Sequence, residues 1–283
     1  MGGISGPTKH DLLYNPRFAV ANFADIAGRW TTDSERVRAR RKCYLDVPYG
    51  TQPSECMDIF RAEGDSKGTL VFIHGGYWRA QDKSGYSFLA ENLVKAGVTV
   101  AIPNYSLCPN VEVRDIVMQM VQACAWLFRN ASNFGAPRNR LIVSGHSAGG
   151  HLTAMMLACV WPAFAADLPP DLVKAGLSIS GIFDAREVVK APSINGDVRL
   201  TRKSAEVVSP VLMPPASEAP LYLAVGGKET GGFHFQHNLI KKKWGKVIAE
   251  DVPCPDDNHF TILDQFASTE SDLFQATLRM LNR

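Results

Sequence analysis

From residue 42 onward the chain alternates short apolar runs with longer amphipathic stretches, and this pattern predicts an α/β fold. The apolar runs have the length of strands, and the stretches between them have the apolar spacing of helices. Strands that alternate with helices usually pair in parallel, with helices on both faces of the sheet. Two glycine-rich motifs, one around Ser147 and one at Gly75-Gly76, indicate which chemistry this sheet carries.

Eight strands are expected in one mainly parallel sheet, and helices are expected between most of them. The predicted strands are 42–47, 57–61, 69–73, 99–102, 141–144, 176–180, 221–225 and 247–252. The predicted helices are 84–95, 113–134, 149–159, 235–244 and 268–281. A short turn rich in Pro, Gly and Ser joins the first two strands, which predicts an antiparallel hairpin at one edge.

The chain is expected to hold one domain at 42–283, preceded by an N-terminal arm at 1–41 that packs on it. The arm is polar and irregular, and we expect one or two short helices in it. The longest loop-like segment, 185–219, is rich in proline and polar residues. Long loops in compact domains are usually functional, so this segment is expected to hold a short helix and part of the substrate pocket. It is too short for a large cap domain.

The composition is that of an ordinary globular enzyme. The 283 residues are 46% hydrophobic and 20% charged, with a net charge of +2. Proteins that bind nucleic acids usually carry a basic excess, so no nucleic-acid partner is expected. No apolar stretch approaches a membrane span, and residues 1–10 lack the apolar core of a signal peptide. We therefore expect no membrane contact and a cytoplasmic location, and we leave a homodimer open.

The cysteines and histidines give no sign of a metal site. The six cysteines form no CxxC pair and no spacing typical of metal ligands, so we interpret them as reduced thiols. His234 and His237 have a spacing that metal ligands use, but no carboxylate cluster accompanies them. The sequence therefore predicts neither a metal nor a cofactor.

The strongest chemical signal is the pentapeptide Gly145-His146-Ser147-Ala148-Gly149. It lies between a predicted strand and a predicted helix. A serine with glycine two residues to either side, on a strand-to-helix turn, is the nucleophile elbow of α/β-hydrolases. The turn is so tight that both flanking positions must be minimal. This motif predicts an α/β-hydrolase fold with Ser147 as the nucleophile, and with the Ala148 amide, at a helix N-terminus, as an oxyanion donor.

A second motif, His74-Gly75-Gly76-Tyr77-Trp78, directly follows the predicted strand at 69–73. Consecutive glycines let the backbone turn its amides toward a reacting carbonyl oxygen, where they stabilise the charge of a tetrahedral intermediate. The alternative interpretation is a plain glycine turn. With the elbow downstream, we favour an oxyanion hole.

The catalytic base and acid are expected late in the chain, in the order serine, acid, histidine. His259 is the only histidine beyond His237, and it follows the last predicted strand, so we predict that it is the base. Glu229 follows the strand at 221–225 and is the first candidate for the acid. Asp184 follows the strand at 176–180 and is the second.

Together these motifs resemble the kynurenine formamidase (arylformamidase) group of α/β-hydrolases. The resemblance rests on the motifs that begin at His74 and Gly145 and on Asn258-His259-Phe260. Further matches are Tyr14-Asn15-Pro16-Arg17, Met57-Asp58-Ile59-Phe60 and Tyr105-Ser106-Leu107-Cys108-Pro109. The resemblance implies that the amides of Gly76 and Tyr77 bind the oxyanion and that Glu229 is the acid.

The sequence therefore predicts a serine hydrolase with a Ser-His-Glu triad and a small-molecule acyl substrate. The resemblance implies a small N-acyl, formyl-like arylamine as that substrate. Two alternatives stay open: a carboxylesterase acting on short-chain or aryl esters, and a catalytically silent binding protein with a hydrolase fold. We also assign four side chains to the substrate pocket: Trp78, His146, Tyr105 and Asn195.

Overall fold

The computed structural model describes residues 6–281. The expectation that the chain has no signal peptide rests on residues 1–10, and the first five of these lie outside the described residues, as does the start of the N-terminal arm. Within the described part, no helix is both long and apolar enough to cross a membrane.

Residues 6–281 contain all eight predicted strands, and they form a single sheet in the order β1-β2-β4-β3-β5-β6-β7-β8. The strands are β1 Cys43–Pro48, β2 Cys56–Phe60, β3 Thr69–Ile73, β4 Thr99–Pro103, β5 Leu141–His146, β6 Val173–Ile179, β7 Leu221–Gly226 and β8 Ile248–Cys254. Strand β2 pairs antiparallel with β1 and with β4, and every other pair is parallel. The mainly parallel sheet and its antiparallel hairpin are thus confirmed.

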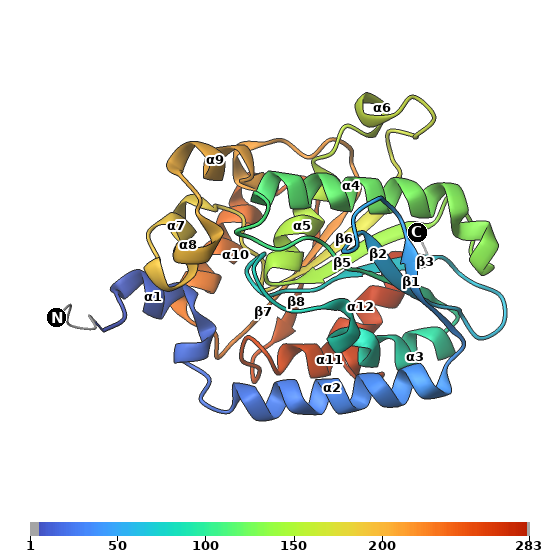
Figure 1. Cartoon of the computed structure of the whole chain (residues 1–283), viewed down its shortest axis with the longest axis horizontal. Coiled ribbons are helices and arrows are strands. Elements are labelled where there is room, and N and C mark those ends of the chain that lie inside the picture. The colour runs from blue at the N-terminus through green and yellow to red at the C-terminus, as the bar shows by residue number, and fades with distance from the viewer. Residues whose placement is uncertain (1–5, 282–283) are drawn as a thin grey trace.

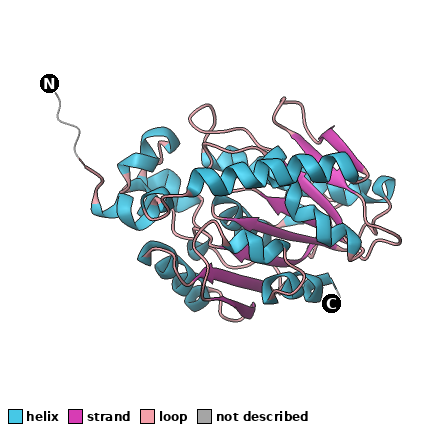
Figure 2. Cartoon of the chain, turned by 90° about the horizontal axis from the view of Figure 1, so that it is seen from below, coloured by secondary structure: helices cyan, strands magenta, loops and turns pink. Residues whose placement is uncertain are grey.

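Helices cover both faces of this sheet (Figure 1, Figure 2). The α-helices are α1 Lys9–Tyr14, α2 Phe23–Arg40, α3 Ala90–Lys95, α4 Val113–Asn130, α5 Ala148–Leu157, α6 Trp161–Phe164, α7 Arg186–Val189, α8 Pro192–Val198, α9 Arg202–Val207, α10 Gly231–Lys243, α11 Ile262–Ala267 and α12 Asp272–Leu281. Short 3-10 helices are η1 Pro16–Phe18, η2 Lys83–Leu89, η3 Ala131–Phe134 and η4 Pro210–Leu212. Figure 1 shows α4 and α5 on one face and α2, α3, α11 and α12 on the other.

The core consists of two apolar layers, one on each face of the sheet. Strand β3 illustrates the arrangement, because successive side chains of a strand point to opposite faces. Val71 and Ile73 pack in the layer under α4 and α5, and Leu70 and Phe72 pack in the opposite layer. Each such side chain contributes about 1.5–3 kcal/mol by leaving water. Burial on both faces explains why the central strands read as continuous apolar runs.

The N-terminal arm differs from the expectation of short helices, because α2 is 18 residues long. Its buried positions, Ile26, Trp30, Ser34 and Val37, recur every three or four residues and place one face of the helix on the sheet domain. Only three of these four residues are apolar, so the stripe is weak in the sequence. For that reason the sequence analysis expected only short helices in the arm and did not predict the length of α2.

The segment 185–219 holds α7, α8, α9 and η4, where one short helix was expected. Figure 1 places two of these helices, α7 and α8, beside α1. The segment and the N-terminal arm thus meet in space although they are far apart in the sequence.

The predicted catalytic residues and the glycine loop follow strands of the sheet. Gly75 follows β3, Ser147 follows β5, Glu229 follows β7 and His259 follows β8. Because these four strands are parallel, their carboxyl ends meet at the same edge of the sheet, where α/β proteins usually bind their ligands.

Candidate active site

Ser147 occupies a strained turn between β5 and α5. Its φ is 57° and its ψ is −114°, a backbone conformation that non-glycine residues rarely adopt. The Ser147 amide donates a hydrogen bond to the Ile179 carbonyl over 2.8 Å, which anchors the turn to the neighbouring strand. A Cβ atom on Gly145 would lie 2.3 Å from the Gly149 carbonyl oxygen, and one on Gly149 would lie 1.9 Å from the Ile73 carbonyl oxygen. Both flanking positions therefore have to be glycine.

Gly149→Ala is expected to destabilise the protein by about 3 kcal/mol, because the added methyl group meets backbone that cannot move cheaply. For a domain of this size we expect a fall in Tm of about 6–12 °C. Gly28→Ala on α2 is the matched control, because no atom lies within 4 Å of the added methyl group. The control should raise stability by about 0.5–1 kcal/mol. Equal Tm values for the two variants would contradict the close packing at the elbow.

His259 and Glu229 form a buried pair. His259 Nδ1 lies 2.6 Å from Glu229 Oε2, and both side chains are almost completely buried. The other carboxylate oxygen of Glu229 accepts hydrogen bonds from Ser180 Oγ at 2.5 Å and from the Gly226 amide at 2.8 Å. The carboxylate is thus held from two sides, and it holds the imidazole through Nδ1. Among residues 6–281 the opposite ring nitrogen, Nε2, has no hydrogen-bond partner, and His259 lines the same cavity as Ser147.

Asp184, the second candidate for the acid, lies in a different environment. Its two carboxylate oxygens accept hydrogen bonds from Arg186 Nε at 2.8 Å and Nη2 at 2.7 Å. Burial raises the pKa of Asp184, and the hydrogen bonds from Arg186 more than offset this, so that its pKa is below the usual value. Of the two candidates, the structure brings Glu229 to His259.

The three predicted oxyanion donors carry amides that are free of backbone partners. Within residues 6–281, neither Gly76 N nor Tyr77 N donates to a backbone carbonyl. Ala148 is the first residue of α5, so its amide has no partner inside the helix. Gly76 and Tyr77 have positive φ values of 107° and 49°, which turn their peptide planes away from the extended course of β3.

Tyr105 braces this glycine loop from behind and does not line the cavity, so its assignment to the substrate pocket is wrong. Its hydroxyl donates to the carbonyls of His74 at 3.0 Å and Gly75 at 3.2 Å. The Tyr105 ring is fully buried and stacks on the His74 ring with 4.2 Å between centroids. Tying down the carbonyls fixes the orientation of the loop's peptide planes.

Trp78 is also wrongly assigned, because it points into the core. Its exposed fraction is 0%, and its indole Nε1 donates to His151 Nδ1 over 3.2 Å. The other nitrogen of His151 donates to the Val208 carbonyl over 2.7 Å. Burial lowers the pKa of His151 to about 4, which keeps this imidazole neutral and lets it accept the indole proton. Both ring nitrogens of His151 are therefore satisfied within the core.

Asn195 is the third wrong pocket assignment. Its side chain closes the turn at the end of α8, where it accepts from the Leu200 amide at 2.8 Å and donates to the Leu200 carbonyl at 3.0 Å. Two residues further along α8, Asp197 does line the cavity. The segment was thus correctly expected to contribute to the pocket, but with a different residue.

His146 is the one predicted pocket residue that lines the cavity. Its Nε2 donates to the His259 carbonyl over 2.7 Å, and the two rings lie 4.7 Å apart. Burial, with a further contribution from His259, lowers the pKa of His146 well below its usual value. A neutral His146 therefore supports the loop that carries His259.

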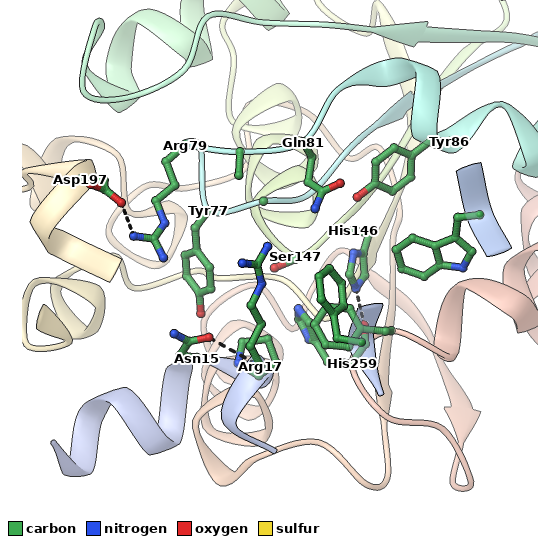
Figure 3. A pocket seen from close by; sticks show the side chains of 16 residues that line it. Asn15, Arg17, Tyr77, Arg79, Gln81, Tyr86, His146, Ser147, Asp197 and His259 are labelled. Carbon is green, nitrogen blue, oxygen red and sulfur yellow. Dashed lines mark hydrogen bonds and ion pairs between the residues drawn. The ribbon is translucent and has the colours of Figure 1, made fainter. Parts of the chain in front are cut away.

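The cavity beside Ser147 has a volume of about 280 Å³ (Figure 3). Aromatic side chains form much of its wall: Phe23, Trp30, Tyr77, Tyr86 and Phe260. Polar side chains that the sequence analysis did not single out also line it: Asn15, Arg17, Arg79, Gln81 and Asp197. Four of these lining residues come from the N-terminal arm. The motif Tyr14-Asn15-Pro16-Arg17 was the signal that could have pointed to the arm as part of the site.

Comparisons with known proteins show that this chain is similar to hydrolases. A family model described as BD-FAE matches residues 57–161. A kynurenine formamidase from Salmo salar is 28% identical over 262 residues, which cover 88% of this chain and 86% of that protein. A solved structure from Silicibacter sp. tm1040, provisionally named a thioesterase, is 31% identical, with a TM-score of 0.84 and coverage of 95% of this chain and 98% of that one. The chain belongs to the α/β-hydrolase family, and within it the chain resembles the kynurenine formamidases.

Membership in this family makes the protein a hydrolase and confirms the predicted fold class. Esterase B from Lactobacillus rhamnosis shares the fold, with a TM-score of 0.65 at 15% identity and coverage of 93% of each chain. Among residues 6–281, no three His, Cys, Asp or Glu side chains gather in a group that could hold a metal ion. His237 instead pairs with Asp251, with 2.8 Å between Nε2 and Oδ1.

Proposed function

We propose that this hydrolase cleaves small N-acyl arylamines, with formyl-like acyl groups, through an acyl-enzyme on Ser147. The observation that carries the proposal is the buried pair of His259 and Glu229, joined over 2.6 Å, whose imidazole lines the same cavity as Ser147. A serine, an imidazole and an orienting carboxylate are the parts of a nucleophilic acyl-transfer site.

In the first half of the reaction, Ser147 Oγ attacks the carbonyl carbon and His259 Nε2 takes the hydroxyl proton. Glu229 keeps the imidazole in the tautomer with its proton on Nδ1, and it stabilises the imidazolium that forms. The carbonyl oxygen becomes an alkoxide, which the amides of Gly76, Tyr77 and Ala148 bind. Preorganised amide donors of this kind contribute several kcal/mol each to transition-state stabilisation, about 2.7–4 kcal/mol in a well-studied case.

In the second half, the bond from carbon to the leaving nitrogen breaks and His259 gives its proton to that nitrogen. Water then attacks the acyl-enzyme with His259 as the base, and the acid is released as Ser147 regains its proton. These steps use only side chains and amides of this chain. An ester follows the same steps with an alcohol as the leaving group.

The walls of the cavity support a small acyl group attached to an aromatic ring. Rings from Phe23, Trp30 and Tyr86 offer apolar, flat surfaces that suit an aryl leaving group. The volume of about 280 Å³ suits a small-molecule substrate. Kinship with proteins named kynurenine formamidase supports an N-formyl arylamine, and kinship with proteins named esterase supports an aryl ester as the second candidate.

A catalytically silent binding protein would have no need of the strained serine or of a buried carboxylate on an imidazole. Both features lower stability when nothing uses them, since strained backbone and buried charge each carry a cost. Their presence together favours an active enzyme.

A substrate panel tests the proposal. N-formylkynurenine, N-formyl and N-acetyl anilines and 4-nitrophenyl acetate are assayed with the full chain, and a fluorophosphonate probe reports the reactive serine. We expect turnover of the formyl anilides and labelling of a single peptide that contains Ser147. Turnover of esters alone would replace the amidase assignment with an esterase. Absence of both turnover and labelling would leave the silent binding protein as the better account.

A further inference from the structure

The charged side chains of the cavity are unevenly paired. Arg79 Nη1 lies 2.5 Å from Asp197 Oδ2 and 3.3 Å from the Ile194 carbonyl, so the charges of Arg79 and Asp197 cancel each other (Figure 3). Arg17, by contrast, has a guanidinium with no ion pair or side-chain hydrogen bond among residues 6–281. The cavity therefore keeps one uncompensated positive charge, at its exposed mouth.

Arg17 is held in place by contacts that leave its hydrogen-bond donors free. Its backbone amide donates to Asn15 Oδ1 over 3.3 Å, and the same Asn15 side chain donates to Ser193 Oγ over 3.1 Å. The guanidinium carbon lies 4.7 Å from the centroid of the Phe23 ring. A guanidinium that rests on a ring uses its flat face for that contact, while its N–H groups point outward from the edge.

The side chain points toward the reacting groups. Figure 3 shows Arg17 reaching from the arm into the cavity that Ser147 and His259 line, on the side opposite Tyr86. The positive charge of Arg17 also acts on Tyr86, which lines the same cavity. Burial raises the pKa of the Tyr86 hydroxyl, and the charge of Arg17 offsets part of that rise. A negatively charged group of a substrate could thus pair with the Arg17 guanidinium while the substrate's carbonyl group lies at Ser147.

We propose that Arg17 binds a carboxylate of the substrate, so that the enzyme prefers anionic acyl compounds over neutral ones of the same size. This inference rests on the proposed function, since it concerns the same cavity. A guanidinium matches a carboxylate with two parallel N–H···O bonds. The carboxylate can belong to the acyl group or to the aryl leaving group, and the two origins share the same recognition chemistry.

Two matched substrate pairs test the inference and separate these origins. The first pair is 4-nitrophenyl hemisuccinate and its methyl ester, which places the carboxylate on the acyl side. The second is 3-acetoxybenzoate and its methyl ester, which places the carboxylate on the leaving group. The measured quantity is the ratio of kcat/KM for the anionic substrate to kcat/KM for its neutral partner, in wild type, Arg17→Gln and Arg36→Gln. Arg36 is an exposed arginine on α2 whose partner is Asp33, and it does not line the cavity.

In at least one pair we expect the ratio to fall about tenfold in Arg17→Gln, which is modest because the guanidinium is exposed at the mouth of the cavity. Arg36→Gln should keep the wild-type ratio, and the wild-type preference should weaken as salt screens the charge. The pair that responds identifies where the carboxylate lies. Ratios in both pairs that are the same in wild type and Arg17→Gln would overturn the inference while leaving the hydrolase intact. Failure to hydrolyse any of the four esters, while the fluorophosphonate still labels Ser147, would also overturn the inference. Failure of hydrolysis together with absence of labelling would instead overturn the proposed function, and the inference with it.

Discussion

Ser147→Ala is expected to lower kcat for a hydrolysed substrate by a factor of about 100,000 or more. The hydroxyl is the group that forms the proposed acyl-enzyme, and the strained turn presents it to the cavity. Alanine fits the same backbone with less volume, so the fold should be retained. The measurement is kcat at saturating substrate, together with the thermal unfolding curve and fluorophosphonate labelling, which should disappear.

Ser144→Ala provides the matched control for this substitution. Ser144 lies three residues earlier on β5, is fully buried, and its hydroxyl has no hydrogen-bond partner among residues 6–281. Removing an unpartnered buried hydroxyl costs little and can even stabilise a protein. We expect Ser144→Ala to keep kcat within about twofold of wild type. Residual turnover by Ser147→Ala near the wild-type rate, with the fold intact, would show that another group performs the chemistry.

The central strands β3, β4 and β5 could be predicted from the sequence because each is an apolar run that is buried on both faces of the sheet. Strand β3, with Leu70 and Phe72 on one side and Val71 and Ile73 on the other, is found at the predicted residues. Helix α2 differs because it is buried on one face only. It buries a single narrow stripe that includes Ser34, and most of its remaining positions are polar, so its sequence resembles an irregular segment.

The same contrast separates the predictable part of the site from the rest. The elbow and the glycine loop are constrained by local sterics, since a Cβ at Gly149 or Gly76 would lie about 2 Å from a carbonyl oxygen, at 1.9 and 2.1 Å. Such constraints can be recognised in the sequence, because they require glycine at fixed positions. The walls of the cavity depend on how distant segments meet, and no local pattern records that Arg17 and Asp197 come together while Trp78 and Tyr105 turn away.

Glu229→Gln is expected to lower kcat by a factor of about 1,000–10,000 while leaving the fold intact. The reason lies in the donors around the carboxylate. Ser180 Oγ and the Gly226 amide both donate to Oε1, so they hold an oxygen at that position. In glutamine the other end is then an NH₂ group, which faces His259 Nδ1 as a donor. The imidazole must accept there, which places its proton on Nε2, and a protonated Nε2 cannot take the proton of Ser147.

The measurement compares Glu229→Gln with Asp184→Asn, the equivalent isosteric change in the other candidate acid. Asp184 binds Arg186, so its change should weaken a local ion pair and keep kcat within about fivefold of wild type. KM should change little in Glu229→Gln, and fluorophosphonate labelling of Ser147 should slow in parallel with kcat, because both depend on the same imidazole. A merely structural role for Glu229 would lower the unfolding temperature without slowing the labelling of the folded enzyme. A larger loss of kcat in Asp184→Asn than in Glu229→Gln would move the acid to Asp184, and the distance of 2.6 Å from Glu229 to His259 would then need another explanation.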